Sequence, residues 1–283
     1  MSQNTTIGAF RRTIWAHYRR AGRRSLPWRR TRDPYAILVS EIMLQQTQVA
    51  RVEKYYGKFL KKFPDFRALA WARQGDVLKV WQGLGYNRRA MFLKRSAEIV
   101  VAQHAGRLPR ARAALEQLPG VGKGTSGSLM AFAFNKPELF IETNIRRVFI
   151  HFFFPKRRKV TDVELARYIE KSIDRKNPRE WYWALMDYGA AMSATYGVAA
   201  LPLRTNPNRR SAHYKKQSPF VGSDRELRGK IMRSTLSQKR NKISMKELLK
   251  ELAVPRERLI DIIKDLIREG FIVKIGDYIC IRK

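Results

Sequence analysis

Short stretches with the apolar spacing of helices fill most of the chain, and this pattern limits the folds that it can adopt. Ile7, Phe10 and Ile14 recur three or four positions apart, and similar spacing continues to about residue 197 with little strand-like alternation. The pattern predicts further helices at 36–44, 48–62, 66–72, 75–81, 88–105, 111–117, 124–134, 142–154, 162–173 and 178–194. Many short helices with short connections predict an all-α domain.

The amino-acid composition changes after residue 200. Residues 201–221 are rich in Pro, Asn, Ser, Arg and Lys, which is typical of a linker or of a strap that contacts a polyanion. Residues 222–283 then show two capping boxes, Ser223 with Glu226 and Ser244 with Glu247, a third helix near Pro255 and a final hairpin. This is the order of a winged helix-turn-helix, which either contacts DNA or serves as a module for protein interaction or packing. We expect domains at 1–200 and 222–283, joined by 201–221.

A glycine-rich turn, residues 118–125 (LPGVGKGT), leads directly into an apolar helix. Backbone N–H groups at the start of a helix, with the helix dipole behind them, bind a phosphate group. Gly120 and Gly122 also permit positive φ and let another backbone come close. The turn therefore predicts phosphate contacts by Gly120, Gly122, Lys123 and Thr125.

The charge of the chain indicates the source of that phosphate. Lys and Arg number 58 against 24 Asp and Glu, for a net charge of +34, which favours nucleic acid as the partner. No apolar run approaches the ~18 residues that a membrane span needs. Cys280 is the only cysteine, so neither a disulfide framework nor a thiolate cluster can form within the chain. The histidines lack metal-ligand spacing, and we expect a cytoplasmic protein, nucleoid-associated when bound to DNA, without a metal or cofactor.

Two glutamates stand among apolar residues. Glu41 lies in the stretch 36–44, and Glu142 lies between two apolar segments. Apolar surroundings disfavour the charged form, so such a carboxyl group can act as an acid at neutral pH. A carboxyl pair near a phosphate-binding turn suggests cleavage of a glycosidic bond. The alternative for Glu41 is a surface or helix-capping residue, and spacing cannot show that the two acids meet.

Four motifs carry a resemblance to a known family. They are LPWR at 26–29, DPY at 33–35, SEIMLQQTQV at 40–49 and GLGY at 83–86. Together they closely resemble the MutY-type adenine DNA glycosylases, and residues 118–125 look like the helix-hairpin-helix of their superfamily, which includes endonuclease III. The resemblance covers roughly residues 7–200 and implies two α-helical lobes with DNA and a flipped base between them.

The resemblance also implies roles for individual residues. Glu41 matches the acid that protonates adenine and then activates water. Gln45 and Gln46 match residues that probe the duplex where the base leaves, and Tyr86 matches an aromatic wedge on the side of the partner base. Gly124 stands where lyase relatives keep a Schiff-base lysine, which implies base removal without strand scission. Base recognition is expected from Arg29, Trp183 and Asn144.

The chain also departs from the family pattern. Glu142 replaces an aspartate, and the four iron–sulfur cysteine positions fall near Ser193, Ala200, Leu203 and Arg209. Without the cluster, we expect packing of Val198, Leu201 and Leu203 to hold that loop. Trp183 stands where relatives use Gln or Glu to read adenine, and the winged-helix unit replaces the MutT-like domain that senses 8-oxoguanine. Residues 209–214 are a candidate substitute for that domain.

These observations predict a DNA repair enzyme that acts on mismatched or damaged double-stranded DNA as a monomer. The leading hypothesis is removal of adenine opposite 8-oxoguanine or guanine. One alternative is a glycosylase for a mismatched thymine or a deaminated base. The other is a non-catalytic DNA-binding protein.

Overall fold

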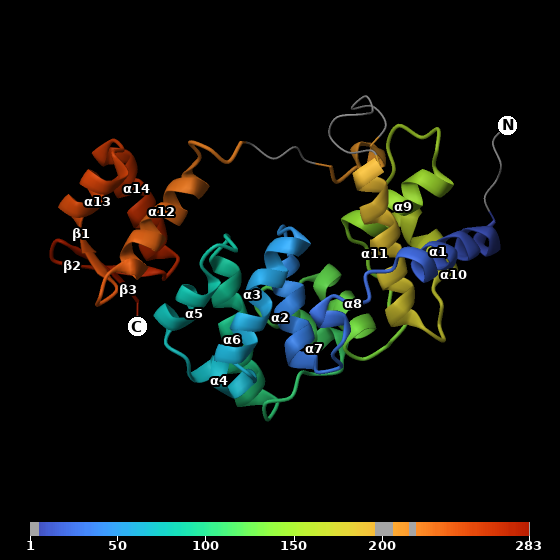
Figure 1. Ribbon diagram of the computed structural model, residues 1–283, viewed down its shortest axis with the longest axis horizontal. Coiled ribbons are helices and arrows are strands. Elements are labelled where there is room, and N and C mark those ends of the chain that lie inside the picture. Colours follow the sequence, from blue (N-terminus) through green and yellow to red (C-terminus); the bar gives the residue numbers. More distant parts are fainter. Residues whose placement is uncertain (1–5, 196–205, 215–218, 283) are drawn as a thin grey trace. The chain divides into compact units, whose positions relative to one another are not determined.

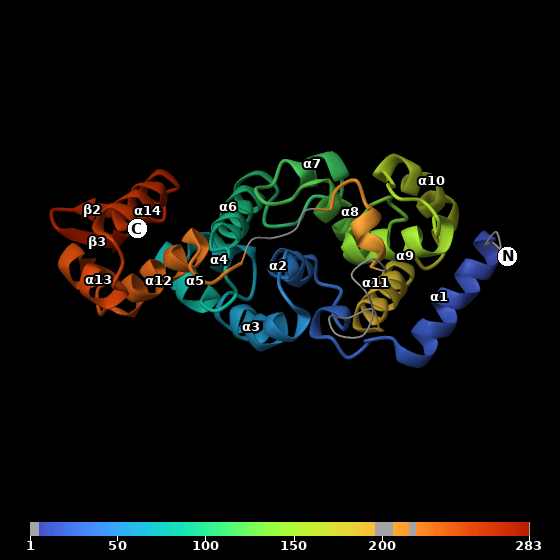
Figure 2. The same cartoon turned by 90° about the horizontal axis from the view of Figure 1, so that it is seen from above.

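The computed structural model describes residues 6–195, 206–214 and 219–282. The chain forms two compact units, each built from two separate stretches. The first unit comprises residues 1–42 and 108–216, and the second comprises 43–107 and 217–283. Figures 1 and 2 show that both consist mainly of helices.

The elements of the first unit agree with the predicted helices to within a few residues. They are α1 (Ile7–Ala21), η1 (Pro27–Arg29), most of α2 (Pro34–Leu44), α7 (Arg112–Glu116), α8 (Lys123–Phe132), α9 (Thr143–Phe153), α10 (Asp162–Ser172), α11 (Pro178–Thr195) and η2 (Pro207–Arg210). The two 3₁₀ turns were not predicted, because three or four residues are too few to show a helical period.

An aromatic cluster forms the core of the first unit. α9 and α11 lie side by side in both views, and α1 packs against α11 (Figures 1 and 2). The ring of Phe10 lies 4.9 Å from that of Phe149 and 5.9 Å from that of Trp181, and all three side chains are fully buried. The apolar stripe of α1 is thus a packing surface, as its helical spacing indicates.

The second unit combines a helical part with the C-terminal elements. Its elements are α3 (Val49–Lys62), α4 (Phe66–Trp71), α5 (Gln74–Trp81), α6 (Arg88–Gln103), α12 (Asp224–Ser237), β1 (Lys242–Ser244), α13 (Met245–Leu252), α14 (Arg256–Arg268), β2 (Ile272–Ile275) and β3 (Tyr278–Ile281). The expected hairpin is present as β2 and β3. β1 was not predicted, and it extends the hairpin to an antiparallel sheet of order β1-β3-β2.

Side-chain contacts hold the C-terminal elements against α5 and α6. Gln74 donates to the carbonyls of Gly270 and Phe271, at 3.0 and 3.1 Å. Glu269 lies between two arginines, with Arg88 at 2.7 Å and Arg228 at 2.5 Å. The C-terminal elements therefore share a compact unit with α5 and α6, which sequence spacing could not indicate.

One of the two predicted capping boxes is complete. Ser244 and Glu247 bond reciprocally at the start of α13. At the start of α12, Ser223 accepts from the N–H of Glu226, but the Glu226 carboxylate accepts from Gly222 instead of Ser223. The capping box predicted at Ser223 therefore forms only one of its two hydrogen bonds. The second is missing because the N–H of Gly222, and not that of Ser223, faces the Glu226 carboxylate.

The described part of the predicted strap binds to the first unit. Val160 donates to the carbonyl of Arg210 at 2.8 Å and accepts from Ala212 at 2.9 Å, as in a single parallel bridge. The Arg210 guanidinium donates to the carbonyls of Phe154 and Pro155 at the end of α9. The packing expected of Val198, Leu201 and Leu203 lies outside the described residues, as do Ala200 and the side chain of Ser193. Among the described helices, none is both long and apolar enough to cross a membrane.

Close packing of α8 yields a testable prediction. A Cβ at Gly127 would lie 2.4 Å from the Cβ of Phe140, whereas one at Gly124 would meet nothing nearer than the Ile141 carbonyl oxygen at 3.8 Å. We expect Gly127→Ala to lower the free energy of unfolding by about 1–3 kcal/mol, because the clash forces α8 away from Phe140.

Denaturant unfolding measures this change, and Gly124→Ala on the same helix is the control, expected to leave stability unchanged or raised. Equal stability of the two variants would contradict the packing described for Gly127.

Candidate active site

Glu41 lies in the third turn of α2, a helix whose other side chains are mostly buried. As a residue Glu41 is half-buried, and Ser128 of α8 donates a hydrogen bond of 2.5 Å to Oε2. Burial raises the pKa of Glu41 to about 7, against a smaller opposing effect of the Ser128 hydroxyl. Glu41 therefore has the environment expected of an acid that titrates near neutral pH.

Glu142 caps the N-terminus of α9. Its Oε1 accepts from the backbone N–H of Asn144 at 2.9 Å and of Ile145 at 3.0 Å. Burial raises the pKa of Glu142, while these two N–H groups and the charges of Arg147 and Arg146 oppose that rise. The longer side chain of a glutamate thus reaches back to the helix start, and Oε2 remains close to the Asn144 amide at 3.4 Å.

The two acids lie within electrostatic range of each other in the first unit, although 101 positions separate them in the numbering (142 − 41). The charge on Glu142 contributes to the raised pKa of Glu41, and the charge on Arg29 acts in the opposite direction. Two carboxyl groups that share a field do not ionise independently. The arrangement can therefore keep one carboxyl protonated while the other carries charge.

Arg147 links the start of α9 to α11. Its guanidinium is buried and donates to Asn144 Oδ1 at 3.0 Å and to the carbonyl of Gly189 at 2.5 Å. A Cβ at Gly189 would lie 2.6 Å from the backbone oxygen of Asn144, so α9 and α11 approach closely here. The Asn144 amide, expected to recognise a base, is engaged with Glu142 and Arg147.

A buried ion pair brings together Arg29 and α11. The guanidinium of Arg29 binds both oxygens of Asp187, at 2.7 and 2.9 Å, and Arg23 adds further bonds. Burial alone would raise the pKa of Asp187, but the bonds and charges of Arg29 and Arg23 hold it below its usual range. The Arg29 guanidinium also lies 5.3 Å from the ring centroid of Trp183, which is buried. Two expected base-recognition residues are therefore neighbours.

The glycine-rich turn joins α7 to α8 as a helical hairpin. Gly120 adopts φ +80°, which requires glycine, but Gly122 has φ −89°. Gly122 does not use the positive φ that glycine permits, because it is the extended N-cap of α8. No side chain caps that N-terminus, and Lys123 and Gly124 are exposed there beside the half-buried Thr125. The turn keeps the geometry of an anion site.

In the second unit, one arginine joins the two segments expected to probe DNA. The buried guanidinium of Arg89 donates to the carbonyl of Gln45 at 2.5 Å, and to those of Leu84 and Gly85 at 3.2 Å. Gln46 and Tyr86 both adopt left-handed φ, at 54° and 49°, and the Tyr86 side chain is 43% exposed. Burial lowers the pKa of Arg89 to about 10, which leaves it charged at neutral pH.

Sequence reasoning missed several residues of this site. They are Ser128, Arg147, Asp187 and Arg89. Asp187 carried a usable signal, since it is an acid within an apolar helix, as is Glu41. Ser128 and the two arginines carried none, because their partners are remote in sequence or are backbone carbonyls.

Side chains that could bind a metal ion do not cluster in the part of the chain that the structure describes. Within the described stretches, no group of three or more His, Cys, Asp or Glu could hold a metal ion. Cys280 lies in β3, and a cluster held by four cysteines does not fit a chain with one.

Comparison with known proteins identifies the family of the chain. Residues 39–175 match the family described as HhH-GPD superfamily base excision DNA repair protein. An adenine DNA glycosylase of Buchnera aphidicola subsp. Baizongia pistaciae is 37% identical over 187 residues, which are 66% of this chain and 53% of that protein. A thymine/uracil-DNA glycosylase of Methanothermobacter thermautotrophicus is 35% identical over 175 residues, 61% of this chain and 79% of that protein.

A solved structure of a thermostable thymine-DNA glycosylase matches with a TM-score of 0.57 at 32% identity, covering 65% of this chain and 86% of that one. The chain belongs to the HhH-GPD superfamily of base excision DNA repair proteins. It spans about half the length of the Buchnera adenine glycosylase that it matches.

The pKa of Glu41 predicts a pH-dependent stability. The folded state holds this proton up to about pH 7, whereas the pKa of an unperturbed glutamate is 4.5, so raising the pH through this window favours unfolding. Glu41→Gln removes the cost of ionising a buried carboxyl group. We therefore expect the free energy of unfolding of this variant at pH 8 to exceed that of the parent, by at most about 3 kcal/mol.

The measurement is the difference in melting temperature between variant and parent from pH 5 to pH 8. It should widen as the pH rises, whereas Glu53→Gln on the exposed side of α3 should give a constant difference. A flat difference for Glu41→Gln would contradict the raised pKa.

Proposed function

We propose that this protein is a DNA glycosylase that flips out a mispaired base and hydrolyses its N-glycosidic bond. The observation that carries the proposal is the partly buried Glu41, with a pKa of about 7, beside the charge of Glu142. Membership of the HhH-GPD superfamily and the anion-binding geometry of residues 118–125 support the same activity.

Glu41 has the properties that both chemical steps require. Near neutral pH a substantial fraction is protonated, so it can donate a proton to the leaving base as the glycosidic bond breaks. The carboxylate formed can then accept a proton from the attacking water. Glu142 stabilises the positive charge that develops on the sugar. Ser128 favours the ionised form of Glu41 through its hydrogen bond and so assists the second step.

The proposed reaction ends at base removal. A lyase step needs an amine that attacks the sugar, and Gly124 has none at the position where lyase relatives carry a lysine. We accordingly propose a monofunctional enzyme that acts without an iron–sulfur cluster. We also propose that it acts as a monomer in the cytoplasm.

The proposed substrate is adenine opposite 8-oxoguanine or guanine. The Buchnera relative is named an adenine DNA glycosylase, and the archaeal one a thymine/uracil-DNA glycosylase. Trp183 is buried, with Phe132 stacked on it at 5.9 Å between ring centroids and the Arg29 guanidinium 5.3 Å from its ring centroid, so its ring does not select one class of base over the other. A mismatched thymine or a deaminated base is thus the second candidate.

We further propose that residues 222–283 form a winged helix that braces the helical part of the second unit. Three cations of α14, the usual DNA-reading helix, are already paired: Arg258 with Asp224, Lys264 with Asp261, and Arg268 with Asp265. In contrast, Arg225 of α12 donates to the Tyr86 hydroxyl at 3.3 Å. These contacts favour support of the Tyr86 loop over sequence reading by α14.

A panel of mismatched duplexes tests the activity and its specificity. After incubation and alkali treatment, we expect strand breaks at A:8-oxoguanine and A:G pairs, none at G:T or G:U pairs, and none without alkali. Glu41→Gln should abolish base release and retain DNA binding, because it removes the proton and preserves the side-chain volume.

Glu142→Asp is the second variant. It shortens the residue to the length used by relatives, and it should retain base release at a changed rate. Turnover by Glu41→Gln would overturn the catalytic assignment. Tight, salt-sensitive binding with no base release from any duplex would favour the non-catalytic alternative.

Ser128 provides a test of how Glu41 is tuned. Its hydroxyl stabilises the carboxylate, so Ser128→Ala should raise the pKa of Glu41 further. Because the first step needs the protonated acid, we expect the alkaline limb of the single-turnover rate to move to higher pH.

Ser126→Ala on the same helix is the matched control, since Ser126 bonds Glu116 and not Glu41. Its pH profile should coincide with that of the parent. An unshifted alkaline limb in Ser128→Ala would remove Ser128 from the mechanism.

A further inference from the structure

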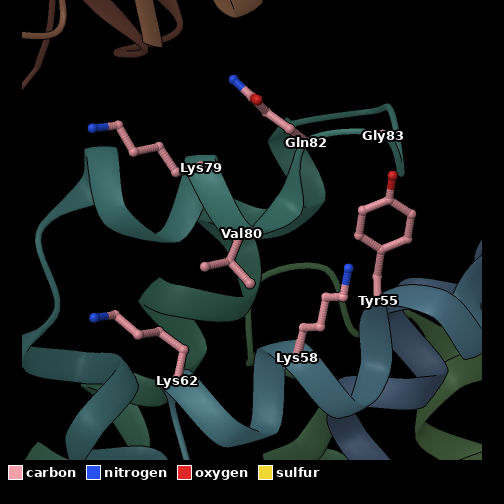
Figure 3. Close-up of a pocket in the computed structure, with 7 residues that line it drawn as sticks. All are labelled: Tyr55, Lys58, Lys62, Lys79, Val80, Gln82 and Gly83. Atoms are coloured by element: carbon pink, nitrogen blue, oxygen red, sulfur yellow. The ribbon is translucent and has the colours of Figure 1, made fainter. Parts of the chain in front are cut away.

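A depression of about 490 Å³ lies between α3 and α5, within the second unit. It is lined by Tyr55, Lys58, Lys62, Lys79, Val80, Gln82 and Gly83. Figure 3 shows Lys58 and Lys62 extending from α3, and Lys79 from α5, with the Tyr55 hydroxyl directed toward Gly83. None of these residues belongs to the predicted active site.

Helix geometry explains why three residues of α3 line the same side of the depression. Tyr55, Lys58 and Lys62 are three and four positions apart, so they share one face of α3. On the inner side of the same helix, the ring of Phe59 packs 5.8 Å from that of Trp81 at the end of α5. This core contact sets the separation of the two helices, and the lysines stand on either side of it at the surface.

The depression carries a concentrated positive charge. Its lining includes three lysines and no acidic residue. Among the described residues, no ion pair or side-chain hydrogen bond engages Lys58, Lys62 or Lys79, although many other cations of the second unit are paired, such as Arg88 with Glu269. Like charges on one surface repel one another, and a polyanion that bridges them reduces that repulsion.

The depression is also joined to the loop that carries Tyr86. Gly83 adopts φ +93°, and a Cβ there would lie 1.9 Å from the Tyr55 hydroxyl oxygen. Tyr55 therefore holds the start of this loop against the wall of the depression. The exposed Tyr86 follows three residues later in the same loop, so one loop carries both a residue that lines the depression and an exposed aromatic side chain.

From this placement we propose that the depression binds the phosphodiester backbone of the duplex that the Tyr86 loop engages. Lysine ammonium groups bind phosphates as point charges and read no base, and an open depression suits a continuous backbone better than a small enclosed ligand. Gln82 and Tyr55 supply neutral donors for phosphate or sugar oxygens. The inference rests on the proposed function only in naming the DNA that is bound.

The test compares two pairs of lysines on one helix. Lys58→Gln with Lys62→Gln removes two charges from the depression, whereas Lys54→Gln with Lys61→Gln removes two exposed charges outside its lining. Affinity for an undamaged duplex is measured by fluorescence anisotropy over a range of salt concentrations, with the fold of each variant checked by circular dichroism.

We expect the plot of log affinity against log salt to become less steep by about two for the depression pair, since each lost phosphate contact lowers the slope by roughly one. The control pair should change the slope by clearly less. Adding Lys79→Gln to the depression pair should reduce the slope again, and Tyr55→Phe should weaken binding without altering it.

Equal slopes for the two pairs would overturn the proposal, because they would show a general positive field instead of a site. Undiminished duplex binding by the depression pair, with inorganic phosphate bound by the parent and lost in that pair, would also overturn it in favour of a small-anion site. The assay measures binding and needs no base release. A protein that removes no base from any duplex could therefore still show the expected slopes, so failure of the proposed backbone site and failure of the proposed glycosylase activity can be told apart.

Discussion

The partial withdrawal of one carboxyl group from water is the constraint on which the first unit depends. α2 must be buried because nearly all its side chains are apolar, and Glu41 is carried inward with them. A carboxyl in that position holds its proton to about pH 7, and Ser128 is the group that limits the cost of ionising it. The same burial that stabilises the helix therefore raises the pKa of Glu41 and lowers the stability of the fold at neutral pH.

Buried arginines hold the surrounding segments in position. Arg29 binds both oxygens of Asp187, Arg147 joins α9 to α11 through Asn144 and Gly189, and Arg89 joins the turn after α2 to the Tyr86 loop. A planar guanidinium suits this work because several fixed donors can meet carbonyls from separate segments. A chain of net charge +34 thus uses some cations internally and leaves many others for a polyanion.

The local sequence pattern was sufficient to predict the helices and to single out Glu41 and Glu142 as acids in apolar surroundings. The predicted spans agree with α3, α8 and α11 to within a few residues because apolar spacing and caps are properties of neighbouring residues. It was insufficient where a few residues decide the outcome. β1 has three residues, Gly122 turned out to be an extended cap, and Glu226 selected the N–H of Gly222. Each of these three features depends on the path of the chain at the start of a helix or strand. The spacing of apolar residues carries no information about that path.

The sequence by itself determined a helical, strongly basic chain, its family motifs and the identity of Glu41 as the candidate acid. Tertiary structure alone decided that Glu142 lies within electrostatic range of Glu41, that Ser128 donates to it and that Asp187 accepts from Arg29. The reason is physical: the pKa of a side chain depends on how much water and which charges surround it. Those neighbours come from helices that are far apart in the chain and adjacent only after folding.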